Sequence, residues 1–144
     1  MEIILQEMLE QLSTMHRSLE KAIAGLSDEA LDWSPGPEMN SLGVLMAHTL
    51  GATRFWIGDV VGGDPSGRVR EAEFMTAGMS AAELIAHSHE VLAHSQSVLS
   101  RLSLADLDAV RKVPDSGREV TGAWAVLHAL EHMALHVGHM EITR

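Results

Sequence analysis

Four histidines recur at helical spacing near the end of the sequence: His128, His132, His136 and His139. Successive residues of an α-helix are about 100° apart, so His132 and His136 lie one turn apart with their side chains about 40° from each other. By the same geometry His128 and His139 fall within about 40° of His132, which places all four on one stripe. Two imidazoles at positions i and i+4 converge above the helix, as in helical metal sites. The spacing therefore predicts a metal site at His132 and His136.

A metal held by only two imidazoles would be weakly bound, so a third ligand is expected from another helix. His48 is the best candidate, because it follows Leu45 by three residues on the apolar face of a second predicted helix. Taken alone, a histidine there is more simply a hydrogen-bonded core residue. With His132 and His136 it completes a set of three imidazoles that leaves at least one coordination position open, as in catalytic zinc sites.

The other candidate residues receive lesser roles. His128 and His139 are candidates for a hydrogen-bond partner of the metal ligands or for a proton shuttle. The sequence does not separate these two roles. Glu131 lies about 100° from His132 and is expected to be a surface charge. His87, His89 and His94 of the predicted helix 81–102 are interpreted as boundary or solvated residues. His16 of the first predicted helix is expected to face away from the apolar stripe of that helix.

The composition excludes other kinds of chemistry. The chain contains no cysteine, which rules out disulfides, a cysteine nucleophile, thiolate zinc sites and iron–sulfur clusters, and fits a cytoplasmic location. The formal net charge of −10 argues against binding to nucleic acid or to anionic lipid. We find neither a signal peptide nor an apolar run of about 18 residues, so no membrane association is expected. A phosphate-binding loop and a GxSxG nucleophile motif are also absent.

The sequence around these histidines predicts helices separated by glycine and proline. Apolar residues at spacings of three and four predict long helices over residues 3–24, 41–61, 81–102 and 122–142. Ser27, Ser41 (or Asn40), Ser80, Ser103 and Thr121 are predicted helix caps. Residues 62–78 form the longest irregular segment, and Trp33, Trp56 and Trp124 are expected to be packing anchors. Because no strand-like alternation is found, we predict an all-α protein, with residues 1–144 forming a single four-helix bundle domain.

Three motifs resemble the DinB/YfiT-like superfamily, in the branch related to mycothiol-dependent enzymes. They are Leu-Asp-Trp-Ser-Pro at 31–35, Ser-Leu-Gly-Val-Leu-Met-Ala-His at 41–48 and His-Met-Ala-Leu-His-Val-Gly-His at 132–139. The resemblance implies a four-helix bundle of up-down-down-up connectivity, often a homodimer. It also implies a divalent metal, commonly zinc or nickel, bound by His48, His132 and His136. Some members of the branch carry Glu where this chain has His132.

The resemblance and the residues together suggest three functions. We expect first a metal-dependent enzyme acting on a small-molecule substrate, with transfer of a low-molecular-weight thiol to an electrophile as its chemistry. Metal-assisted hydrolysis is the second possibility. A non-enzymatic metal- or small-molecule-binding module of a stress response is the alternative from another class. A bundle with buried histidines and no metal also stays open at this point.

Overall fold

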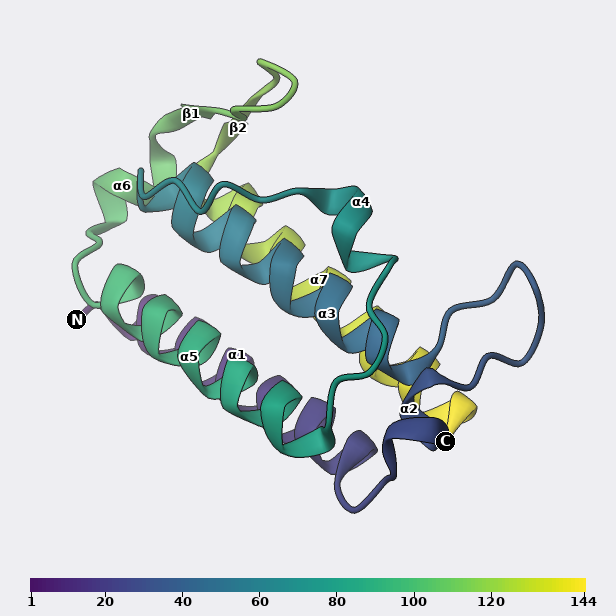
Figure 1. The fold of residues 1–144 in the computed structure, drawn as a ribbon. Coiled ribbons are helices and arrows are strands. Elements are labelled where there is room, and N and C mark those ends of the chain that lie inside the picture. The colour runs from purple at the N-terminus through teal and green to yellow at the C-terminus, as the bar shows by residue number, and fades with distance from the viewer.

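The computed structural model describes residues 1–144 and is built around four long helices. These are α1 (Ile3–Ile23), α3 (Leu42–Thr53) with its π-helical continuation η1 (Arg54–Val61), α5 (Ala81–Leu99) and α7 (Gly122–Thr143). Helix α1 packs against α5 and α7, and α3 with η1 packs against the same two helices from the other side, which closes a ring of four (Figure 1). The predicted all-α helical bundle is therefore confirmed. None of its helices is both long and apolar enough to cross a membrane.

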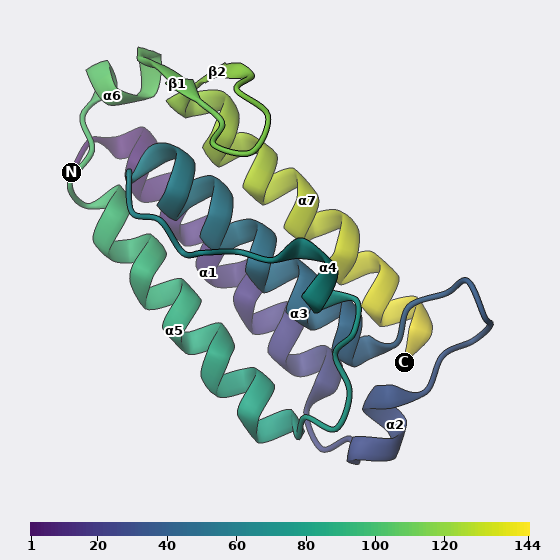
Figure 2. The same cartoon turned by 45° about the horizontal axis from the view of Figure 1, so that its top comes forward.

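The direction of the helices explains the longest connection. Helices α1 and α7 run one way and α3 and α5 run the other way, which is the up-down-down-up order (Figure 1). Because α3 and α5 are parallel, the chain must return along the length of the bundle between them. This crossover, residues 62–80, passes over α3 and contains the short helix α4 (Arg70–Glu73) (Figure 2). The sequence predicted only an irregular segment here, so α4 was missed.

The predicted caps are confirmed, and they set where the helices begin. The Ser41 hydroxyl accepts from the Val44 amide at the start of α3, and the Thr121 hydroxyl accepts from the Trp124 amide at the start of α7. Ser27 caps α2 (Asp28–Asp32) in the same way. Ser80 and Ser103 form capping boxes at the starts of α5 and α6 (Leu104–Asp108). The two helices that carry the candidate ligands thus have fixed starting points.

The second long helix reaches Val61 as predicted, but its last eight residues form a π-helix. The Gly62 amide donates to the Ile57 carbonyl at 2.9 Å, five residues back rather than four. π-Helical turns are rare and are frequently found near functional sites. Here the segment presents Trp56 to α7, where its ring lies 5.4 Å from the ring of Trp124.

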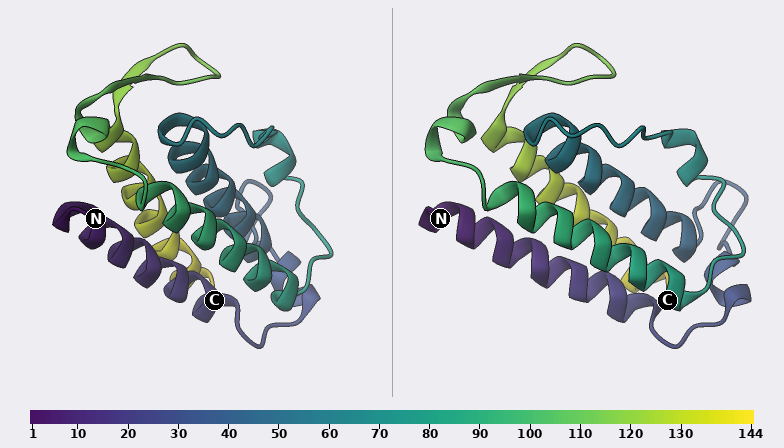
Figure 3. Two further views of the ribbon diagram at one scale, coloured as in Figure 1. Left: turned by 90° about the vertical axis from the view of Figure 1, so that its left-hand side faces the viewer. Right: turned by 60° about the vertical axis from the view of Figure 1, so that its left-hand side comes forward.

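Two sequence-based expectations were wrong. A hairpin is present: β1 (Val110–Lys112) pairs antiparallel with β2 (Glu119–Thr121), with Val110 opposite Thr121. It projects beyond the helices and leads directly into α7 (Figure 3). Strands of three residues are too short to show a period-2 pattern, which is why none was predicted. Trp33 is not a packing anchor, because it is 57% exposed, whereas Trp56 and Trp124 do pack against the core.

Candidate metal centre

Helices α3 and α7 bring the three predicted ligands together. The Nε2 atom of His132 lies 3.0 Å from Nε2 of His48 and 3.2 Å from Nε2 of His136. One nitrogen from each of the three rings lies within 4.8 Å of the other two, and His48 is buried while the other two are half-buried. His132 and His136 are one turn apart on α7, as their spacing required, and His48 faces them from the antiparallel helix.

The arrangement fits a divalent metal. Zinc binds imidazole nitrogen at about 2.0–2.1 Å, so two ligands of a tetrahedral ion are separated by about 3.3 Å. The two separations of 3.0 and 3.2 Å are close to that value. Imidazole donors suit zinc and nickel alike, so the donor set does not choose between them. We call His48, His132 and His136 the three-histidine cluster.

The surroundings keep two of these imidazoles neutral, which is the form that binds metal. Burial, with a smaller contribution from the neighbouring His136 and His48, lowers the pKa of His132 to about 3. Burial, followed by the nearby His48 and His139, lowers the pKa of His136 to about 4. At neutral pH neither ring must lose a proton before it can coordinate an ion.

The two further histidines of the stripe lie on either side of the cluster. His139 is exposed, and its Nδ1 lies 3.3 Å from Nδ1 of His136. His128 is farther from the cluster, with its ring centre 6.3 Å from that of His132. It stacks on Trp124 at 4.6 Å and meets the edge of Trp56 at 4.9 Å. His128, Trp56 and Trp124 therefore form an aromatic wall beside the cluster.

The sequence reasoning missed the residues that α4 and the crossover bring to His48. The Nδ1 atom of His48 lies 3.0 Å from Oε1 of Glu73, and Arg68 donates two hydrogen bonds to the same carboxylate, at 2.7 and 2.9 Å. The ring of Phe74 lies 4.8 Å from that of His48. These residues fall in a segment without periodicity. Only the need for a crossover over α3 could have pointed to them.

The expectation for His16 was wrong. It is fully buried, and its Nδ1 lies 2.8 Å from the hydroxyl of Ser88 on α5. The buried face of α1 includes His16 beside the predicted apolar residues Leu12 and Leu19, because α1 packs against both α5 and α7. Burial, with a smaller effect of His89, lowers the pKa of His16 to about 4.

The remaining sequence candidates lie outside the cluster. His87, His89 and Glu131 are exposed, as expected. His94 is half-buried, and its Nε2 lies 2.8 Å from a carboxylate oxygen of Asp64.

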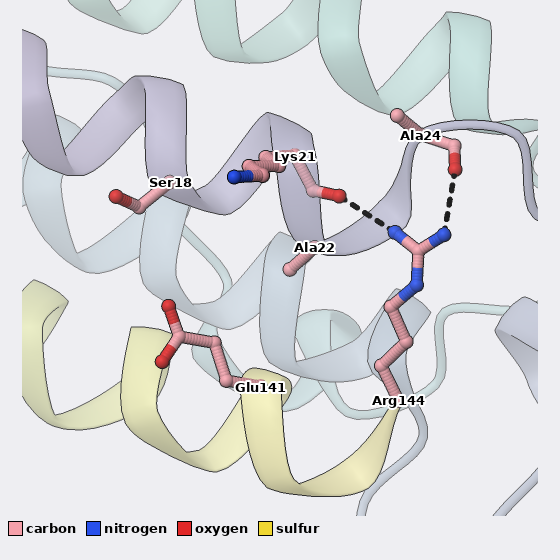
Figure 4. Close-up of a pocket in the computed structure, with 6 residues that line it drawn as sticks. All are labelled: Ser18, Lys21, Ala22, Ala24, Glu141 and Arg144. Carbon is pink, nitrogen blue, oxygen red and sulfur yellow. Dashed lines mark hydrogen bonds between the residues drawn. The ribbon is translucent and has the colours of Figure 1, made fainter.

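Three surface hollows lie near the C-terminal end of α7. The largest, of about 620 Å³, is lined by residues of α1 and α7 and contains none of the clustered histidines. There Arg144 donates to the carbonyls of Lys21 and Ala24, so its cation caps the end of α1 (Figure 4). The smallest hollow, of about 240 Å³, borders His139 and is also lined by Met39, Leu45 and Ile142. Of the three, only the smallest adjoins the histidine stripe.

Comparisons with known proteins agree with the fold and identify a family. A family model described as mycothiol-S-transferase matches residues 5–144. A conserved protein of Enterococcus faecalis has a similar structure, with a TM-score of 0.81, 17% identity and coverage of 99% of this chain and 95% of the other. A DinB-like protein of Bacillus cereus gives a TM-score of 0.77 at 20% identity, with coverage of 96% and 89%. A DinB-like protein of Bacillus subtilis gives 0.72 at 17% identity, with coverage of 94% and 87%. No curated protein sequence matches the chain.

Proposed function

The chain belongs to the mycothiol-S-transferase family, and on that premise we propose that it is a divalent-metal-dependent enzyme that transfers the sulfur of a low-molecular-weight thiol to an electrophile. The three-histidine cluster carries the proposal, because three Nε2 atoms converge on one point between α3 and α7. We propose His48, His132 and His136 as ligands of zinc or nickel. When bound, such a metal supplies a Lewis acid that lowers the pKa of a coordinated thiol toward neutrality.

The residues around the cluster suggest how the substrates are held. The aromatic wall of Trp56, Trp124 and His128 offers flat apolar surface on one side of the cluster. On the other side, the hollow beside His139 has apolar lining from Met39, Leu45 and Ile142. Flat and concave apolar surfaces with a few polar groups are typical of small-molecule sites. We propose that thiol and electrophile occupy these two sides.

The proposed transfer needs only the thiol, the electrophile and a base. With an organic halide as electrophile, the sulfur of the thiol forms a bond to the carbon, and the electron pair of the carbon–halogen bond leaves with the halide. The thiol proton must pass to a base. His139 suits this role better than His128, because it is exposed and contacts His136, so it can pass the proton on to solvent.

The proposal is tested by turnover of the metal-loaded protein. Zinc- or nickel-loaded protein is incubated with a thiol panel (mycothiol, bacillithiol and glutathione) and an organic halide, and mass spectrometry detects the thioether. We expect product with wild type and with the exposed His87→Ala variant, and none with His136→Ala. Tight metal binding without product from any thiol would contradict S-transfer and favour a binding module. Metal-dependent cleavage of an ester or amide instead would favour the hydrolase.

Four further expectations stay predictions. They are a homodimer, a cytoplasmic location, a single domain and no binding to nucleic acid. Light scattering of the purified protein tests the first of these directly.

A further inference from the structure

The crossover holds a carboxylate against the one cluster histidine that comes from α3. Glu73 meets Nδ1 of His48 at 3.0 Å, on the ring nitrogen opposite the one that faces His132. Both side chains are nearly buried, with exposed fractions of 9% for His48 and 11% for Glu73. No carboxylate contacts the other two histidines: Nδ1 of His132 is buried without a partner, and Nδ1 of His136 meets His139. His48 is therefore the ligand whose orientation is fixed from outside the cluster.

The carboxylate decides which nitrogen of His48 carries the proton. The guanidinium of Arg68 donates to both oxygens of Glu73, and this paired cation favours the ionised form of the carboxylate. An ionised carboxylate only accepts hydrogen bonds, so Nδ1 of His48 must be the protonated nitrogen. The lone pair is then on Nε2, which points at the cluster. A carboxylate in this place also fixes the ring and raises the basicity of the ligand.

Two features hold the carboxylate in place. Arg68 grips both of its oxygens, at 2.7 and 2.9 Å, from within the crossover. On the other side, Gly51 leaves room for it on α3, one turn after His48. A Cβ added at Gly51 would clash with Oε2 of Glu73 and lie 2.6 Å from its Cδ. Glycine is less favourable than alanine in a helix interior, so its presence at this contact calls for a reason.

We propose that Glu73 is a positioning residue for the metal site, held by Arg68 and by the space above Gly51, and that it sets His48 in the tautomer that binds the ion. This inference rests on the proposed function. It gives the crossover and α4 a role: they carry the carboxylate that prepares His48 before any metal arrives. Removing such a partner of a ligand typically weakens metal binding about 10–100-fold.

The test compares zinc affinity in Glu73→Ala, Gly51→Ala and the double variant, measured by competition with a chromophoric chelator. Gly51→Ala keeps the carboxylate but displaces it, and since the clashing atoms are the end of a flexible side chain, the helix itself is not disrupted. Gly138→Ala is the matched control, because an added Cβ there has nothing within 4 Å. We expect each single variant to bind zinc about 10–100-fold more weakly and the double variant to bind no more weakly than Glu73→Ala.

A second readout separates positioning from a purely structural effect. Long-range proton–nitrogen NMR of the metal-free protein reports which ring nitrogen is protonated. We expect His48 to carry its proton on Nδ1 in wild type and in Gly138→Ala, and to lose this single tautomer in Glu73→Ala and Gly51→Ala. Wild-type zinc affinity in both single variants, or an unchanged His48 tautomer, would overturn the inference. A wild-type protein that binds no zinc or nickel would instead overturn the proposed function, while the tautomer measurement still decides the role of Glu73.

Discussion

His48 and His132 meet across the bundle with their ring centres 4.8 Å apart and their planes at 73°, although 84 residues separate them in the chain. The antiparallel packing of α3 on α7 makes this contact. His136 joins it from one turn further along α7, with its ring centre 4.4 Å from that of His132. Helices α3 and α7 thus hold three imidazoles together at an interface that otherwise packs through apolar residues. The function of the protein depends on what binds there.

Added metal is expected to stabilise the wild-type protein through this cluster. A ligand that binds only the folded state at about 100 times its dissociation constant adds about 2.7 kcal/mol to the free energy of unfolding. Zinc should therefore raise the melting temperature of wild type and of His87→Ala, measured by calorimetry after removal of bound metal. It should leave that of His136→Ala unchanged. An equal rise in His136→Ala would mean that the ion binds elsewhere.

The stability of the metal-free protein should depend on pH through His16. The unfolded chain takes up a proton on this histidine near pH 6.5, whereas burial keeps the folded form neutral down to about pH 4. The stabilisation is therefore complete above pH 6.5 and is lost as the pH falls toward 4, by up to about 3 kcal/mol. Urea unfolding of wild type and His16→Asn across this range measures the difference. A variant with the same pH dependence as wild type would count against this assignment.

The two half-buried cluster histidines on α7 are expected to stay neutral in mildly acidic solution. An ordinary imidazole, with a pKa near 6.5, is almost fully protonated at pH 5. Because burial lowers the pKa values of His132 and His136 to about 3 and about 4, both should remain neutral there in metal-free protein. Nitrogen chemical shifts of the two rings between pH 4 and pH 8 report this. If both rings instead titrated near pH 6.5, the cluster would be far more open to water than its half-buried position in the structure indicates.

The same substitution should have opposite effects at the two ends of α7. A Cβ at Gly122 would lie 2.5 Å from the backbone carbonyl oxygen of Asp106 and 3.3 Å from Cα of Leu107, and backbone atoms cannot easily move aside. Gly122→Ala should destabilise the protein by about 1–3 kcal/mol. At Gly138 nothing lies within 4 Å, so alanine should stabilise the helix by up to about 1 kcal/mol. Denaturant unfolding of the two variants compares them, and equal effects would argue against the close packing of α6 on α7.

The sequence predicted those parts of the site that depend on helical periodicity. His132 and His136 share a face because of their spacing alone, and His48 stood out as a polar residue in an apolar pattern. Periodicity failed where contacts are non-local. The ring of packed helices buries His16, and the crossover carries Glu73 to His48 from 25 residues away. Neither contact leaves a local signal, and the hairpin at 110–121 is too short to show one.

The metal content of untagged protein, purified without chelator or added metal and measured by mass spectrometry, tests the three-histidine site directly. We expect about one zinc or nickel ion per chain in wild type and in His87→Ala, and none in His132→Ala. Wild-type protein without metal above background, and unable to take up zinc at micromolar concentration, would contradict the metal site and leave a bundle whose histidines serve another purpose.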